Sequence, residues 1–199
     1  MAIEWHESVE ELLSALGDEA QIRSKLHMKQ HMSYRRRNQC YTLPVVILST
    51  LAGSGNFISE GYESFTKKYM ILGIGIVSIF TSILSAVQNF LKLAELSESN
   101  RMSSLFWGKF YSRLKFQLSL QRHDREGCHD YLLSIFAEYD RLYETSPVLH
   151  TKFISSIKKK LKNLKGIVLP YYLNGFNHTR AYGGFEDNTF ADDEKSVVV

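Results

Sequence analysis

The side chains of this sequence that could do chemistry gather in one short stretch, QRHDREGCHD, which holds His123, Asp124, Cys128 and His129. Histidine and cysteine bind zinc, but adjacent Cys128 and His129 cannot easily ligate one ion together, and the spacing fits no standard zinc motif. We interpret the stretch as a polar turn between two helices. The sequence contains no glycine-rich phosphate loop, G-x-S-x-G elbow or metalloprotease motif. We therefore expect no catalytic residues, no metal site, no cofactor and no enzymatic activity.

The composition points to a helical protein with little net charge. The chain has 199 residues, and its 12 Gly and 3 Pro are few enough to favour helices. Its 24 Lys and Arg against 21 Asp and Glu leave a net charge of +3, which argues against a nucleic-acid partner. Two cysteines are too few for a disulfide framework, which favours a reducing environment.

Two long segments without charged side chains dominate the pattern. Residues 38–59 and 69–91 contain no Asp, Glu, Lys, Arg or His, and each matches the roughly 20 residues that cross a bilayer as a helix. Pro44 lies near the start of the first segment, where proline is tolerated in a helix. The sequence predicts two transmembrane helices joined by the short connector 60–68.

The distribution of basic residues predicts the orientation of these helices. Arg35, Arg36 and Arg37 precede the first segment, whereas the connector balances two lysines with two glutamates. Because Lys and Arg concentrate on the cytosolic side of membrane proteins, we expect both termini in the cytosol. The first 20 residues carry six acids and no Lys or Arg, so we expect no secretory signal there.

The remaining sequence predicts a helical bundle on the cytosolic side. Residues 1–37 form an amphipathic head, and 92–145 form an unbroken stalk that ends near Glu126-Gly127, followed by a return helix. The head either packs on this body or docks a partner. Ser146-Pro147 opens a basic amphipathic helix over 146–166, and 167–199 form an irregular polar and acidic tail. The expected fold class is all-α: a transmembrane hairpin, a cytosolic bundle and an irregular tail.

The helix expected over 146–166 carries a dense group of lysines, which includes Lys158, Lys159, Lys160 and Lys162. Lysines opposite an apolar face are typical of a helix that lies on anionic lipid. We predict that these lysines and Arg35 to Arg37 contact the membrane surface. A solvated helix face, or an acidic protein or nucleic acid as partner, is the alternative.

Small and polar residues recur at helical spacing along the second uncharged segment: Gly75, Ser78, Ser82, Ser85 and Asn89. Small residues allow close helix contact, so this stripe is expected to pack on Ser49, Ala52, Gly53 and Asn56 of the first segment. Alternatively, several copies turn the stripe inward to line a pore.

The order of these parts carries a family resemblance. It rests on Tyr34-Arg35-Arg36-Arg37, on Leu51-Ala52-Gly53, and on the run FLKLAELSESNRMSSLFWGKFYSRL after the second segment. Over residues 25–140 the chain resembles the SLATT family of two-transmembrane effector domains. In that run, the residues that look like the family's exit helix are Phe90, Leu93, Ser97, Glu98, Asn100, Arg101, Tyr111 and Leu114. The resemblance implies a pore-forming effector of nucleotide-signalled bacterial defence, and similar proteins are encoded by large DNA viruses.

Two functions follow as hypotheses. The first is a structural membrane protein that anchors a protein layer to a bilayer, as a minor capsid protein does between a viral inner membrane and the capsid. The second is an oligomeric, SLATT-like pore, and an adaptor of a cellular membrane is a further possibility. The expected partners are anionic lipids, proteins of a larger assembly and further copies of the chain.

Overall fold

The computed structural model describes residues 4–59 and 64–161, and this part of the chain is helical without any strand. The prediction of an all-α protein is confirmed for these residues. The helices are α1 (Glu7–Ser59), α2 (Ser64–Leu91), α3 (Leu93–Ser119), the 3-10 turn η1 (Arg122–Asp124), α4 (Cys128–Thr145) and α5 (Thr151–Leu161). Lys162 and the tail expected over 167–199 lie outside the described residues.

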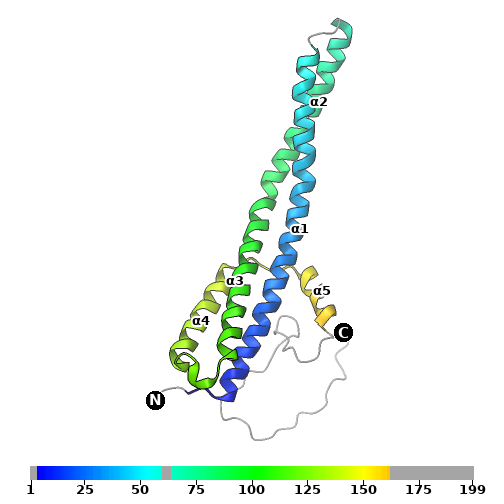
Figure 1. Ribbon diagram of the computed structural model, residues 1–199. Coiled ribbons are helices and arrows are strands. Elements are labelled where there is room, and N and C mark those ends of the chain that lie inside the picture. Colours follow the sequence, from blue (N-terminus) through cyan, green and yellow to red (C-terminus); the bar gives the residue numbers. More distant parts are fainter. Residues whose placement is uncertain (1–3, 60–63, 162–199) are drawn as a thin grey trace, which may run out of the picture.

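The molecule is long and narrow, with two different ends (Figure 1). Helix α1 runs along its whole length, α2 lies beside the C-terminal half of α1, and α3 lies beside the N-terminal half. Helix α4 packs on α3 at the lower end, and the short α5 lies against α1. The N-terminus of α1 and the start of α4 therefore lie at the same end of the molecule.

Helix α1 crosses the expected boundary between residues 37 and 38 without a break. Its 53 residues correspond to a length of about 80 Å at 1.5 Å per residue. From Ile22 to Arg37 the sequence is rich in good helix formers and has neither Gly nor Pro, so nothing in it ends the helix. The head and the first uncharged segment are two halves of a single helix.

The segment formed by α2 and α3, in contrast, is interrupted where an unbroken helix was expected to leave the second uncharged segment. Lys92 separates α2 from α3 and adopts a left-handed conformation, with φ of 46° and ψ of 36°. A residue with a side chain pays strain in this conformation, so the surrounding packing must hold it there. The expectation of a continuous helix to Glu126-Gly127 was wrong at its far end too, because α3 ends at Ser119.

The core of the lower end is built from α1, α3 and α4. Its centre is aromatic, since the fully buried Trp107 meets Phe110 at 82° and Tyr139 at 79° between ring planes. The other buried members are Leu13, Ala20, Leu114, Tyr131, Ile135 and Leu142, with Trp5, Val9 and Leu16 packed against them. The interpretation that the head packs on the body is thus confirmed, although Leu12 is exposed.

Ser146 and Pro147 end a helix, whereas the sequence predicted that they would begin one. The Ser146 hydroxyl donates to the Leu142 carbonyl at 2.6 Å and accepts a hydrogen bond from the Trp107 indole at 2.8 Å. These bonds hold Ser146 at the C-terminal cap of α4. The next helix, α5, starts only at Thr151, so the predicted basic helix begins later than expected.

Candidate membrane-spanning region

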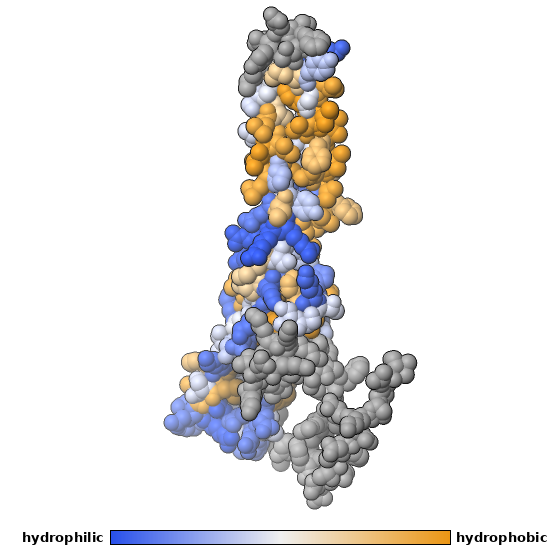
Figure 2. Space-filling view, turned by 90° about the vertical axis from the view of Figure 1, so that its right-hand side faces the viewer, coloured by the Kyte–Doolittle hydropathy of each residue, from blue (hydrophilic) through white to orange (hydrophobic). Residues whose placement is uncertain are grey.

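The upper end of the molecule exposes apolar side chains almost continuously. Figure 2 shows this end covered by hydrophobic surface, with hydrophilic surface directly beneath it. On α2, for example, Ile79 is 63% exposed and Phe80 is 55% exposed. Exposed apolar residues of α1 at the same end include Leu43, Val46, Ile47 and Leu51. A surface this apolar and this large marks a contact with lipid or with another protein.

By length and composition, one helical stretch among the described residues is apolar enough to cross a membrane. It is Lys67–Ser119, which contains most of α2 and all of α3, and only 6% of its most apolar window is buried. The helix of a soluble core would be mostly buried, so the exposure favours a membrane helix. The length, composition and exposure of this segment thus support its association with a membrane, whereas a span by residues 38–59 stays a prediction.

The contacts between α1 and α2 involve a polar cluster at their lower border. The Gln88 side chain donates to the Thr42 hydroxyl at 2.7 Å and to the Asn38 side-chain oxygen at 3.3 Å. Further up, Thr81 is buried and its hydroxyl donates to the Val77 carbonyl in its own helix. These bonds satisfy polar groups that would be costly to leave unpaired in lipid.

The small and polar stripe of α2 does not make this contact, so the expected packing within one chain is wrong. Ser78, Ser82 and Asn89 are exposed, Ser85 is half-buried, and a Cβ added to Gly75 would meet nothing within 4 Å. On α1, Ala52 is buried, but Ser49 and Gly53 are exposed. The reason is helical phase: α2 turns the adjoining face, with Thr81 and Gln88, toward α1. The pore alternative for this stripe is untested.

The predicted basic residues occupy two separate places. Arg35, Arg36 and Arg37 are exposed on α1 directly before the first uncharged segment. Lys158, Lys159 and Lys160 lie in the last turns of α5. Helix α5 runs antiparallel to α1, because His150 contacts Tyr34 while Ile157 packs near Ile22 and Leu26. The lysine-bearing end of α5 therefore lies further from the apolar end than its beginning (Figure 1).

The apolar face of α5 packs on protein in this arrangement. Phe153, Ile154 and Ile157 contact the buried Ile22 and Leu26 of α1. The Lys29 ammonium of α1 also donates to the Ser156 hydroxyl at 2.5 Å. A helix docked in this way has its apolar face occupied, so lipid contact through that face would require α5 to leave α1. The prediction that its lysines contact the membrane surface remains untested.

Between the two ends, α1 and α3 meet through a row of buried polar residues that the sequence did not single out. His27 and Asn100 are fully buried and share a hydrogen bond of 3.0 Å between Nδ1 and Oδ1. One turn up, His31 bonds to Ser97, and one turn down, the Ser24 hydroxyl donates to the Ser104 carbonyl at 2.8 Å. Ser97 and Asn100 were noted only for the family resemblance, and no motif distinguishes the others from surface residues.

Burial sets the protonation of His27. The loss of hydration lowers the pKa of His27 below its usual 6.5, the hydrogen bond with Asn100 opposes the shift, and the nearby Arg23 charge adds to it. The Nε2 atom is buried and has no hydrogen-bond partner in the described structure. The neutral imidazole is thus the form that this interface accommodates.

The histidine-rich stretch is a turn, as interpreted, and it fastens the head to the body. Glu10 of α1 accepts hydrogen bonds from Arg122 at 2.8 Å and from Arg125 at 2.6 Å, and these bonds lower the pKa of Glu10 to about 2. The Trp5 indole donates to the Glu126 carbonyl at 3.0 Å. Within the described residues, no three His, Cys, Asp or Glu side chains come close enough to hold a metal ion.

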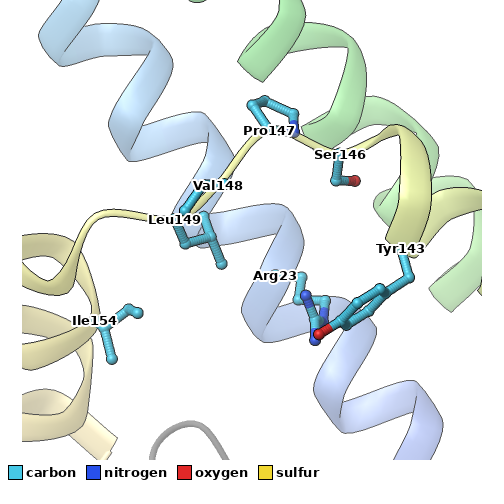
Figure 3. Close-up of a pocket in the computed structure, with 7 residues that line it drawn as sticks. All are labelled: Arg23, Tyr143, Ser146, Pro147, Val148, Leu149 and Ile154. Atoms are coloured by element: carbon cyan, nitrogen blue, oxygen red, sulfur yellow. The ribbon is translucent and has the colours of Figure 1, made fainter.

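A pocket of about 240 Å³ opens where α1, α4 and the segment before α5 meet (Figure 3). Its walls include Val148, Leu149 and Ile154, and Arg23 and Tyr143 lie on the other side, with the guanidinium 4.8 Å from the ring centre. Arg23 is buried and forms an ion pair of 2.7 Å with Glu19. Because this charge is already balanced, the pocket offers little to an anion.

Comparison with known proteins adds no assignment, since no protein-family model, no curated protein and no solved structure matches this chain. The function is therefore inferred from the distribution of apolar and charged side chains over the fold.

Proposed function

We propose that this chain is a non-enzymatic integral membrane protein with a structural role. In this proposal α2 and the uncharged part of α1 cross a bilayer as a hairpin, and α3, α4 and the first part of α1 form a bundle on the cytosolic side. The bundle attaches a protein layer to the membrane, as a minor capsid protein would between a viral inner membrane and its shell.

The observation that carries the proposal is the contrast in burial along a single helix. In its first half α1 buries Leu13, Ala20 and Leu26, whereas in its second half it exposes Val46, Ile47 and Leu51. Water penalises exposed apolar surface by roughly 25 cal/mol per Å², so the second half requires an apolar surrounding. Lipid is the surrounding that fits two adjacent uncharged segments of bilayer length.

The charges at the border support the same reading. Arg35, Arg36 and Arg37 lie directly before the uncharged part of α1, and Lys92 directly follows α2. All four are therefore on the side of the bundle, as expected when that side faces the cytosol.

The test is membrane extraction combined with topology mapping. We expect the full chain to remain in the membrane pellet at alkaline pH and to require detergent for release. Protease added to the cytosolic side should cleave within the turn at 120–127 and spare residues 64–91. A monodisperse chain in detergent-free buffer would contradict the proposal.

An oligomeric pore of the SLATT type is the second candidate, and the exposure of the α2 stripe favours it. Ser78 and Ser82 point away from α1, so they are available to other copies of the chain. Purified protein in liposomes should then release a trapped dye, and Ser82→Leu should abolish the release, while Ile79→Leu should not. Liposomes that stay sealed at many copies per vesicle would favour the structural role.

A further inference from the structure

A second pocket lies where α5 begins, at the lower border of the uncharged part of α1. It has a volume of about 180 Å³ and is lined by Tyr34 and Arg37 from α1 and by His150 and Lys152 from the start of α5. Arg37 is the last residue before the uncharged segment that begins at Asn38. The pocket therefore lies within about one helical turn of the apolar surface.

Specific hydrogen bonds hold the two walls of this pocket together. The Tyr34 hydroxyl and the His150 Nε2 atom lie 2.7 Å apart. Gln30 bonds twice to the segment before α5: its amide donates to the Val148 carbonyl at 3.0 Å, and its oxygen accepts from the His150 backbone N–H at 3.2 Å. These bonds bring Lys152 to the same pocket as Arg37, although the two residues are far apart in the sequence.

The lining of the pocket is basic and rich in hydrogen-bond donors. It contains the side chains of Arg37 and Lys152 together with the hydroxyls of Ser33 and Thr151, and it contains no carboxylate. Neither Arg37 nor Lys152 has an ion-pair partner among the residues that the structure describes. Helix α5 also starts at Thr151; the Phe153 and Ile154 N–H groups bond to the His150 carbonyl, and the N–H groups of Thr151 and Lys152 precede the first helical hydrogen bond.

We propose that this pocket binds the phosphate of an anionic phospholipid headgroup, an inference that rests on the proposed membrane-spanning role of the adjacent segment. Arginine forms paired hydrogen bonds to phosphate, and lysine supplies a compact positive charge. A soluble phosphate would meet the same donors, but the Phe153 ring in the lining and the apolar surface next to Arg37 favour a ligand with acyl chains. The bound headgroup would join the start of α5 to α1 at the level of the membrane surface.

The test uses the full chain in non-ionic detergent, with native mass spectrometry to count bound lipid. Dioctanoyl phosphatidic acid is the probe, dioctanoyl phosphatidylcholine is the neutral comparison, and inorganic phosphate is the soluble one. We expect phosphatidic acid to bind at one site, and Arg37→Gln and Lys152→Gln each to weaken it about tenfold, the loss typical of one charge-assisted hydrogen bond. Arg36→Gln is the matched control and should stay within about twofold of the wild type.

Three results would overturn the inference. Equal weakening by Arg36→Gln and Arg37→Gln would mean diffuse attraction to a basic surface. Phosphatidylcholine binding as tightly as phosphatidic acid would mean that the apolar surface alone binds the lipid. Saturation by inorganic phosphate at the same concentration would identify a soluble ligand.

Alkaline extraction separates this inference from the membrane-spanning proposal. Both pocket variants should stay in the membrane pellet, because the change does not touch the uncharged segments. Release of the wild-type chain at alkaline pH would remove the spanning proposal, whereas normal retention with no effect of Arg37→Gln on lipid binding would remove only the pocket.

Discussion

The two halves of α1 belong to one unbroken helix but differ in which side chains they bury. The first half turns Leu13 inward against α3 and α4 and Leu26 inward against α5, and leaves charged residues such as Glu11 outside. The second half has no charged residue, exposes its apolar side chains, and keeps its polar contacts with α2 at the border, through Asn38 and Thr42. Helix formation is therefore common to both halves, and the surrounding medium decides which side chains lie on the outside.

The largest expected effect concerns the centre of the bundle. Trp107→Ala removes a fully buried ring and should destabilise the bundle by about 3–5 kcal/mol, because a large cavity remains. Hydrogen exchange of the full chain in micelles should show faster exchange in α3 and α4 and unchanged exchange in α2. The neighbouring Phe106, 38% exposed, gives the control, since Phe106→Ala should alter exchange only slightly. Equal effects of both variants would contradict an aromatic core.

The second prediction addresses the apolar end. Ile79→Arg places a charge near the middle of α2 and should disfavour insertion by about 2.5–3.5 kcal/mol. We expect a large fraction of this variant to leave the membrane pellet at alkaline pH. Leu105→Arg on α3, where the native residue is also exposed, should remain in the pellet. If the two variants partition alike, the distinction between the two ends is wrong.

The third prediction concerns pH and the interface between the ends. Because burial lowers the pKa of folded His27, the unfolded chain takes up a proton first as the pH falls below 6.5. The stability of the α1–α3 interface should therefore be constant above this pH and decrease below it. Urea unfolding of the bundle at pH 7.5 and 5.5 measures the change. His27→Gln should reduce the difference, whereas a change at the exposed His123 should preserve it.

The smallest predicted effect lies within the hairpin. Gln88→Leu removes the bonds to Thr42 and Asn38 and should weaken the pairing of α1 and α2 by about 0.6 kcal/mol, the average for such bonds in membranes. Steric trapping in bicelles measures this pairing. Asn89→Leu, at an exposed neighbouring position, should leave it unchanged. A larger loss for Asn89→Leu would assign the contact to the small and polar stripe.

Much of the fold followed from the sequence because apolar periodicity and uncharged runs are local signals. Helical periodicity predicted the amphipathic head and the helices of residues 92–145, and the structure buries Leu13, Phe110, Leu114 and Tyr131 of these elements in one core. The sequence wrongly predicted that Ser146-Pro147 begins a helix, because a serine that caps the end of a helix and one that begins a helix can have the same local sequence. Its role depends on Trp107, which lies 39 residues earlier.

The candidate sites depended more on tertiary context. The stripe from Gly75 to Asn89 has clear spacing, but spacing cannot tell which face of α2 meets α1. Likewise, the contacts of His27 with Asn100 and of Tyr34 with His150 join residues more than 70 positions apart. No local pattern reports such pairs, so the buried polar row and the basic pocket emerge only once the helices are in place.

The left-handed Lys92 has a consequence for the register of the long helices. On α2, Thr81 and Gln88 face α1 and are seven positions apart, which is close to two helical turns. On α3, Leu93, Ser97 and Asn100 follow each other at four and three positions, but Gln88 and the buried Leu93 are five apart. Five residues of an uninterrupted helix would rotate Leu93 about 140° past one turn and swing α3 off its partner. Lys92 is thus one extra residue in the helical register, and its left-handed conformation restores the face of α3 that contacts α1. In a chain without Lys92, α2 and α3 would keep the same face toward α1 as one straight helix, and the joint between the apolar end and the bundle would be lost.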